Sequence, residues 1–484
     1  MAPVAINDPA EAVQSRVEEL KAQQRQQAPQ LATRTWHGPV PMSTKVAKIK
    51  NPIRQLLAGI DLGSTPKQGE LKPLINLGLG DPSTFGNLPP PKEALDAIHA
   101  SLDSGLANGY PASVGYADAR QAIAQYFSEG NGGNFRPTEN DIVLAHGCSG
   151  ALEMALASLT SPDQNILLPK PLFTAYEAMV ATIECEIRYY DLLPNEGWQV
   201  DFESVEKLID DKTALLLINN PSNPCGSNWS ESHLRDIASF CHRMCLPVIS
   251  DEVYAGFAWA VSNPDPARPP TLVSRPVVEG KFNRGCFTSF TSVCGDLPVL
   301  TVGALSKRYL APGLRVGWVM IHDPMNRFIQ VRDGLNRLAF RIQGPSSNVQ
   351  RALPAIFQNV PQSFYDDTLK TLQDVGQKLH ARLSGIEGLQ PYLSDGAMYL
   401  LCKGLRNFDV SQFIDDNEDP TDADTLDKAF ITALHKEENV FILPGAAFRL
   451  EGGFIRFVTT VPEHILMQAC SRLEAFCERH RIRA

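Results

Sequence analysis

The chain has 484 residues, of which 43% are apolar and 20% charged, and it carries a formal net charge of −10. This composition is typical of a globular protein, and the acidic balance argues against a nucleic-acid-binding protein with a basic face. There is no run of about 18 apolar residues that could cross a membrane. The first 30 residues contain acids and glutamines, which argues against a secretory signal or a mitochondrial presequence. We therefore expect a cytoplasmic protein.

The ten cysteines are scattered singly along the chain. The closest pair is Cys241 and Cys245, and no second pair or nearby histidine completes a zinc site. We therefore expect reduced, mostly buried thiols and no bound metal.

Residues 1–45 are polar, rich in Gln and Ala and interrupted by prolines, which predicts a mobile extension with one exposed helix over 13–27. From about residue 72, apolar runs of strand length alternate with helical stretches. This alternation predicts an α/β fold with a mostly parallel sheet covered on both faces. Strands are expected at 141–145, 164–168, 213–219, 246–251, 299–303 and 316–321, and helices at 150–159, 230–244 and 361–382.

The remainder of the chain, up to Cys477, mixes helical and strand patterns and indicates a smaller α+β domain. Its acidic stretch, residues 415–427, is expected to be a solvated surface loop.

Polar groups follow the predicted strands at their carboxyl ends, where ligands bind in sheets of this kind. The first strand leads into His-Gly-Cys-Ser-Gly (146–150) at the start of a helix, a position that suits a phosphate. A later strand leads into Asn-Asn-Pro-Ser-Asn-Pro-Cys-Gly (219–226), whose prolines favour a turn-rich loop. Each feature taken alone is also found in ordinary turns that follow a strand.

The next strand ends at Asp251, with Tyr254 three residues later. A carboxylate at the end of an apolar strand is costly without a partner, and a pyridinium N–H would be such a partner. Tyr254 could donate a hydrogen bond to the phenolate oxygen of the same ring. The alternative is a helix-capping aspartate beside a packed tyrosine.

Lys307 follows another apolar strand, and Arg315 precedes a further one. A lysine partly removed from water suits imine chemistry, whereas a lone lysine is more often an extended surface side chain. The guanidinium of Arg315 offers paired donors that suit a phosphate.

Taken together and in this order, these features resemble the fold-type I enzymes that depend on pyridoxal 5′-phosphate (PLP), and among them the aminotransferases that act on tyrosine. The resemblance runs from about Lys48 to Cys477. It rests on five motifs: Gly-Asp-Pro-Ser-Thr-Phe-Gly-Asn-Leu-Pro (80–89), Asn-Gly-Tyr-Pro-Ala-Ser-Val-Gly-Tyr (108–116), Asn-Pro-Ser-Asn-Pro-Cys-Gly (220–226), Ser-Lys-Arg-Tyr-Leu-Ala-Pro-Gly-Leu-Arg-Val-Gly-Trp (306–318) and Gly-Ala-Met-Tyr (396–399).

The family implies a large domain with a mostly parallel seven-stranded sheet between helices, and a smaller α+β domain. On this pattern, 1–45 is the N-terminal extension and 46–85 contributes to the small domain. Residues 86–345 form the large PLP-binding domain, and residues 346–484 form the small C-terminal domain.

The resemblance also implies how the cofactor is held. Lys307 would form a Schiff base with PLP and then move the proton between Cα and C4′. Asp251 would pair with the ring nitrogen, and Asn223 and Tyr254 would bond the ring hydroxyl. The remaining contacts expected for the cofactor are the backbone of Cys148 and Ser149 with Arg315 for the phosphate, and Phe173 stacked on the ring.

For the substrate, Arg456 would bind the α-carboxylate, Asn223 would assist it, and Gly80 would lie in a loop that approaches the substrate. Tyr110 would reach the phosphate of a neighbouring subunit, which implies a homodimer with shared active sites. The expected reaction moves an amino group to a 2-keto acid such as 2-oxoglutarate by a ping-pong mechanism. Tyrosine is the best candidate donor.

Other readings remain open at this point. The same cofactor residues would serve a C–S lyase, an aminocyclopropane-carboxylate synthase, or an aminotransferase with broader or different amino-acid specificity. A catalytically inactive binding protein is a third possibility, which the complete set of cofactor residues disfavours. The sequence departs from the family around 259–298, where extra residues predict a surface insertion, and in the N-terminal extension, for which no counterpart is evident.

Overall fold

The computed structural model of the chain describes residues 9–27, 42–50, 53, 72–130, 136–262, 286–414, 419 and 421–482. Two units can be separated, Met1–Ala47 and Lys48–Ala484. The first contains helix α1 (Pro9–Gln27) and the short helix α2 (Thr44–Ala47). Side chains 14–23 of α1 are exposed, so the predicted exposed helix is confirmed and begins four residues earlier than expected.

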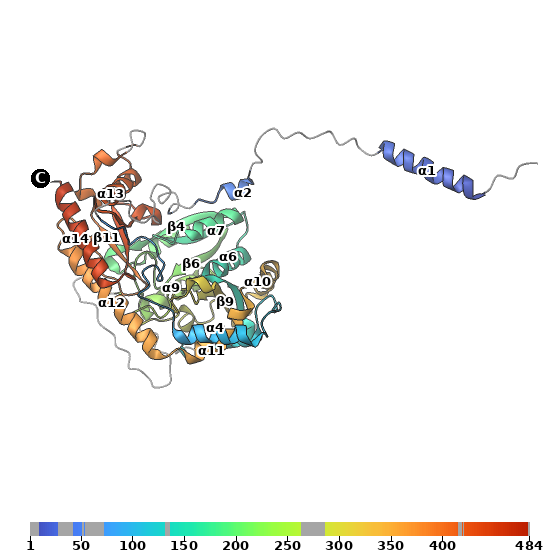
Figure 1. The fold of residues 1–484 in the computed structure, drawn as a ribbon, viewed down its shortest axis with the longest axis horizontal. Helices are drawn as coiled ribbons and strands as arrows, with labels where there is room; N and C mark the ends of the chain where they lie inside the picture. The colour runs from blue at the N-terminus through green and yellow to red at the C-terminus, as the bar shows by residue number, and fades with distance from the viewer. Residues whose placement is uncertain are drawn as a thin grey trace, which may run out of the picture. The chain divides into compact units, whose positions relative to one another are not determined.

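The main sheet of the second unit has eight strands in the order β2-β9-β8-β7-β6-β3-β4-β5. Figure 1 labels three of its strands, β4, β6 and β9. Six of them run in one direction, and β9 and β5 run in the opposite direction. The strands are β2 (Ile142–His146), β3 (Asn165–Lys170), β4 (Glu186–Leu193), β5 (Gln199–Val200), β6 (Thr213–Asn219), β7 (Val248–Asp251), β8 (Val299–Ala304) and β9 (Val316–His322). The sheet is mostly parallel, as predicted, and the two-residue strand β5 brings it to eight strands instead of seven.

Helices cover both faces of this sheet because successive side chains of a strand point to opposite faces. Leu215 and Leu217 of β6 pack with α6 (Gly147–Leu159), α7 (Ala175–Ile183) and α10 (Ile329–Ile342). Leu216 and Ile218 pack on the other face with α8 (Phe202–Leu208) and α9 (Glu231–Arg243). The strand therefore has to be a continuous apolar run, which is the pattern that the sequence shows.

Two further groups of elements complete the second unit. Helices α4 (Lys92–Ser104), α5 (Ala117–Gly130) and α11 (Ser347–Asn359) pack beside β2 and β9. A four-stranded antiparallel sheet has the order β10-β11-β14-β13, and a parallel pair joins β1 (Ile75–Asn76) to β12 (Val440–Phe441). The strands of the four-stranded sheet are β10 (Gln390–Pro391), β11 (Tyr399–Lys403), β13 (Leu443–Pro444) and β14 (Phe454–Val458). The second unit also contains the helices α12 (Gln362–Ser384), α13 (Ala423–Glu438) and α14 (Glu463–His480).

The prediction of a solvated acidic loop over 415–427 is wrong for its second half. Asp422 caps α13 by accepting a hydrogen bond from the Thr425 N–H, so the helix begins within the acidic stretch. Asp427 is only 1% exposed, and its Oδ1 lies 3.1 Å from Arg406 Nη2. Burial raises the pKa of Asp427 to about 7. Residues 415–418 and 420 lie outside the described residues.

The stretch around 259–298 is not a surface insertion where the structure describes it. Trp259 and Phe290 are buried on either side of residues 263–285, which lie outside the described part of the chain. The Glu252 carboxylate, at the end of β7, accepts hydrogen bonds from the Ser289 hydroxyl and the Phe290 N–H. These hydrogen bonds attach the residues that follow 263–285 to the end of β7 in the main sheet.

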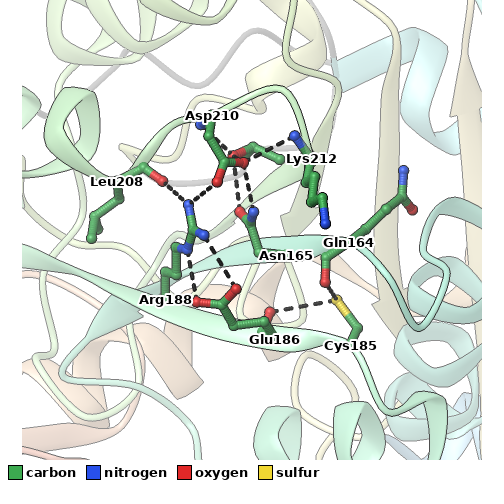
Figure 2. A network of polar contacts seen from close by, with 9 residues as sticks. Gln164, Asn165, Cys185, Glu186, Arg188, Leu208, Asp210 and Lys212 are labelled. Carbon is green, nitrogen blue, oxygen red and sulfur yellow. Dashed lines mark hydrogen bonds and ion pairs between the residues drawn. The ribbon is translucent and has the colours of Figure 1, made fainter.

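A polar network joins three strands at the amino-terminal edge of the main sheet, where β3, β4 and β6 begin (Figure 2). Arg188 donates to both carboxylate oxygens of Glu186, and its Nη1 lies 2.8 Å from Asp210 Oδ2. Asn165 donates to Asp210 Oδ1, and the Leu208 carbonyl accepts a further bond from Arg188.

No described helix is long and apolar enough to span a membrane.

Candidate active site

A cavity of about 240 Å³ lies at the opposite, carboxyl-terminal edge of the main sheet. The side chains that line it come from the ends of the sheet strands, from the loop after β1 and from the four-stranded sheet. The predicted site residues found around this cavity are Gly80, Cys148, Ser149, Phe173, Asn223, Asp251, Tyr254, Lys307, Arg315 and Arg456. Tyr110 is the one predicted site residue that does not line it.

Sheet topology explains why residues so distant in sequence meet here. Asn219 and Asp251 are paired in register as the last residues of the neighbouring parallel strands β6 and β7. Lys307 follows the next strand, β8, by three residues. The first residue of β9, Val316, pairs with His146, the last residue of β2, because these strands are antiparallel. Arg315 therefore lies at the same edge as the start of α6.

Asp251 is a buried carboxylate, 3% exposed, that lines the cavity. Its Oδ2 accepts a hydrogen bond of 2.6 Å from the Tyr176 hydroxyl, and its Oδ1 accepts from the Val253 N–H and the Cys148 thiol. No cationic side chain of the described residues forms an ion pair with it, and burial raises its pKa above the ordinary value. A ligand with a protonated ring nitrogen would supply the missing positive charge.

The start of α6 and Arg315 form a site suited to a phosphate. His146 precedes α6 without a side-chain cap, so N–H groups of the first turn, which includes Cys148 and Ser149, are available to a ligand. Gly147 is required here: its φ is +69°, and a Cβ would lie 2.7 Å from Arg315 Nη2. The guanidinium also donates to the His146 and Pro312 carbonyls, which fixes it beside the helix end.

Lys307 is held between the loop after β1 and the turn after β7. Its Nζ donates to the Gly80 carbonyl and lies 5.9 Å from the centre of the Tyr254 ring. The amine is thereby directed into the cavity that Asp251 and Arg315 also line. This is the geometry that a lysine needs to reach a ligand between the phosphate site and the carboxylate.

Arg456 comes from β14 of the four-stranded sheet and is 3% exposed. Its Nη1 donates to Asn223 Oδ1 over 2.9 Å, its Nη2 donates to the Gly78 carbonyl, and its Nε is buried without a hydrogen-bond partner. The rings of Tyr399 and Phe448 flank the guanidinium at 4.3 and 4.5 Å. No carboxylate of the described residues pairs with it, so a buried positive charge remains for an anionic ligand.

The two predicted aromatic contacts differ in their surroundings. Phe173, just before α7, lines the cavity and packs edge-on against Tyr176 with ring centres 5.6 Å apart. Tyr110 is 90% exposed, away from the cavity of its own chain. Its position leaves the predicted contact with a neighbouring subunit untested.

Two tyrosines of the cavity were missed as site residues. Tyr176 follows Phe173 by three residues, but nothing local indicates that its hydroxyl reaches Asp251, 75 residues away. Tyr399 ends the motif Gly-Ala-Met-Tyr, which pointed to a family without indicating a role. Its hydroxyl lies 2.7 Å from that of Tyr254.

The donor set as a whole fits PLP, a molecule with a phosphate, a protonated ring nitrogen, a ring hydroxyl and an aldehyde. The groups of the cavity lining that could hold these parts are the α6 start with Arg315, Asp251, Asn223 with Tyr254, and Lys307, respectively. Within the described residues there is no cluster of three or more His, Cys, Asp or Glu side chains that could hold a metal ion.

The chain is similar to several known proteins. A family model described as aminotransferase class I and II matches residues 72–473. The tyrosine aminotransferase of Mus musculus is 38% identical over 435 residues, covering 90% of this chain and 86% of that one. An S-alkyl-thiohydroximate lyase of Arabidopsis thaliana is 32% identical over 84% of this chain and 81% of its own. The solved tyrosine aminotransferase of Leishmania infantum is 29% identical, with a TM-score of 0.78 over 92% of this chain and all of that chain.

Proposed function

This chain belongs to the class I and II aminotransferases, which are PLP-dependent enzymes of fold type I, and from that premise we propose that it transfers the amino group of an aromatic amino acid to a 2-keto acid. Tyrosine is the proposed donor and 2-oxoglutarate the proposed acceptor. One observation carries the proposal: Asp251 and Arg456, which have no oppositely charged partner among the described residues, line the same cavity as Lys307 and Arg315. The relatives named tyrosine aminotransferase support the choice of donor.

The residues proposed to hold the cofactor follow from the chemistry of each contact. Lys307 would carry it covalently as a Schiff base, and Arg315 would bind its phosphate with the N–H groups at the start of α6. Asp251 would keep the ring nitrogen protonated. The proposed contacts to the rest of the ring are Asn223 and Tyr254 for the hydroxyl and Phe173 for one face.

When bound, PLP withdraws electrons from the substrate Cα through its protonated ring, which makes the Cα proton acidic. Once the substrate amine has displaced Lys307 from the cofactor, the freed Nζ would be the base that takes the Cα proton and delivers it to C4′, because Lys307 lines the cavity. Tyr176 and the Val253 N–H keep the Asp251 carboxylate oriented toward the ring through their hydrogen bonds.

Arg456 orients the substrate by binding its α-carboxylate in place of the Gly78 carbonyl, one of its present partners. Asn223 already contacts Arg456, so a single loop supports both the carboxylate and the ring hydroxyl. The amino acid and the keto acid would use the same carboxylate site in turn. Ping-pong kinetics are therefore expected.

We propose that the active protein is a homodimer in which Tyr110 reaches the phosphate site of the partner subunit. Its 90% exposure is compatible with such a contact. The cytoplasmic location expected from the sequence remains a prediction.

A PLP-dependent lyase is the alternative function, and the similarity to a thiohydroximate lyase favours keeping it. A C–S lyase or an aminocyclopropane-carboxylate synthase could use the same cofactor residues. Release of pyruvate and ammonia, or of a thiol, in the absence of any keto acid would support the lyase.

The deciding experiment follows the visible absorbance of the purified holoenzyme during addition of tyrosine and then 2-oxoglutarate. We expect tyrosine to remove the cofactor band and 2-oxoglutarate to restore it, with one 4-hydroxyphenylpyruvate formed per site. A band that ignores tyrosine but responds to another amino acid would overturn the donor alone. Absence of any cofactor band after reconstitution with PLP would overturn the function.

A further inference from the structure

Tyr399 touches both halves of the site although no role was assigned to it. It is the first residue of β11, is 2% exposed, and lies on the cavity wall. Its hydroxyl is 2.7 Å from the Tyr254 hydroxyl, and its ring lies 4.3 Å from the Arg456 guanidinium carbon. One side chain therefore connects the proposed carboxylate site with the residue proposed to bond the cofactor ring.

The Tyr399 hydroxyl is fixed in place by close neighbours. A Cβ on Gly80 would lie 2.4 Å from its oxygen, and a Cβ on Gly226 would lie 2.4 Å from its backbone carbonyl oxygen. The Tyr254 and Tyr399 rings meet edge-on at 5.7 Å with an angle of 82°. Because packing restricts both rings, the hydroxyl contact does not depend on a mobile side chain.

The direction of the Tyr254–Tyr399 hydrogen bond follows from the proton that each hydroxyl has. Each tyrosine has one O–H, and either could be the donor in this pair. If Tyr254 donates its proton to the ring oxygen of the cofactor, Tyr399 has to donate to Tyr254. A donor bonded to the Tyr254 oxygen makes Tyr254 a stronger donor in turn.

We propose that Tyr399 is a positioning residue that orients Tyr254 and strengthens its hydrogen bond to the cofactor ring oxygen, an inference that rests on the proposed function. The charged or titratable groups around Tyr254 within the described residues are Asp251, Tyr176, Tyr399, Lys307 and Arg456. Burial raises the pKa of Tyr254 well above its usual range, so the tyrosine stays a neutral donor at working pH.

Tyr399→Phe should shift the pKa of the Lys307–cofactor linkage in a single direction, upward. Without the Tyr399 hydroxyl, Tyr254 donates more weakly, and the ring oxygen keeps more negative charge. That charge favours the protonated Lys307–cofactor linkage, so the pH at which the linkage loses its proton should rise by about half to one unit. Turnover should fall roughly 2- to 10-fold, while the phenyl ring remains beneath Arg456.

The test is a visible-absorbance pH titration of four holoenzymes: wild type, Tyr399→Phe, Tyr254→Phe and the double variant. We expect an upward shift for each single variant and no further shift when Tyr399→Phe is added to Tyr254→Phe, because the first acts through the second. Tyr190→Phe is the matched control: it removes another buried hydroxyl, bonded to the Leu217 carbonyl at 2.8 Å away from the cavity lining. Its titration should match that of wild type.

Two outcomes would overturn this inference while leaving the proposed function intact. One is a wild-type titration curve for Tyr399→Phe, and the other is a shift of full size in the Tyr254→Phe background. Thermal unfolding of each apo-protein separates a loss of folding from a loss of this contact. A wild-type protein without a cofactor band would instead contradict the proposed function itself.

Discussion

The two edges of the main sheet use charged residues in opposite ways. At the amino-terminal edge, Arg188 pairs with Glu186 and Asp210 (Figure 2). At the carboxyl-terminal edge, Asp251 is buried without an oppositely charged partner among the described residues, and so is Arg456, which reaches the same cavity from β14 of the four-stranded sheet. The charges at the amino-terminal edge thus pair with each other, whereas those around the cavity at the other edge are left for a ligand.

The pKa values of the charged groups shift in opposite senses in the two places. Hydrogen bonds from Arg188 lower the pKa of Glu186, and a bond from Asn165 followed by those from Arg188 lowers the pKa of Asp210 to about 2. Burial, in contrast, raises the pKa of Asp251 and lowers that of Arg456. Charged forms are favoured at the first edge and disfavoured at the second, which marks the second as the place for a charged ligand.

The largest expected effect comes from Lys307→Ala at the carboxyl-terminal edge. Turnover should fall by about 10³-fold or more because Lys307 supplies the only amine among the described residues that line the cavity. The measurement is single-turnover conversion of tyrosine on protein reconstituted with PLP. Lys378→Ala, which alters an exposed lysine paired with Glu463, should behave as wild type. Substantial transamination by Lys307→Ala would contradict the assigned role.

Asp251→Asn should separate folding from cofactor binding. The apo-protein should be at least as stable as wild type, because a buried carboxylate without a cation is replaced by a neutral group. PLP should bind more weakly, and turnover should fall roughly 10²-fold. Equilibrium dialysis with PLP and thermal unfolding give the two readouts.

The matched control for that variant is Asp395→Asn. Asp395 is also buried, but its carboxylate accepts from the Ser262 hydroxyl outside the cavity lining. We expect unchanged PLP affinity for this control. Equal loss of PLP affinity in both variants would mean that PLP binding depends on any buried carboxylate in this region. That result would contradict the assignment of Asp251 as the partner of the ring nitrogen.

Arg456→Lys should raise KM for tyrosine and for the keto acid together, by roughly 10- to 100-fold, because paired donors are replaced by a point charge. Steady-state kinetics with both substrates provide the measurement. Arg472→Lys is the control, since this buried arginine donates to the Pro73 and Glu438 carbonyls outside the cavity. An increase of KM for one substrate only would show that the two substrates do not share the carboxylate site.

The smallest effect is expected at the amino-terminal edge. Arg188→Gln should lower the urea midpoint of unfolding slightly and leave turnover unchanged. The pKa of Asp210 is lowered in the folded chain, so its contribution is present above the ordinary value of 3.8 and is lost as the pH falls toward about 2. The difference between variant and wild type should therefore narrow on acidification below about pH 4.5. A constant difference down to pH 3 would contradict the ion-pair account.

The sequence identified the strands of the carboxyl-terminal edge because each is a continuous apolar run followed by a polar residue. The predicted strand 213–219 coincides with β6, and the strands that end at Asp251 and precede Lys307 lie within a few residues of their predicted bounds. Burial on both faces is a strong local signal. The pairing of Asn219 with Asp251 then follows from strand adjacency.

Side-chain contacts between distant parts of the chain left no recognisable pattern in the sequence. The Tyr176–Asp251 and Tyr399–Tyr254 hydrogen bonds join residues 75 and 145 positions apart. Asp427 was misjudged because acidic residues are usually solvated, whereas this one faces Arg406 from inside a helix. Side-chain partners of this kind depend on the assembled fold, and composition alone does not reveal them.

Chemical trapping of the cofactor gives the most direct test of the central claim that the carboxyl-terminal edge carries PLP on Lys307. The holoenzyme is reduced with borohydride, which converts a Schiff base into a stable secondary amine, and its peptides are sequenced by mass spectrometry. We predict one modified residue, Lys307, and no modification of Lys307→Ala. A cofactor label on a different lysine, or none on protein that shows the cofactor band, would contradict the account.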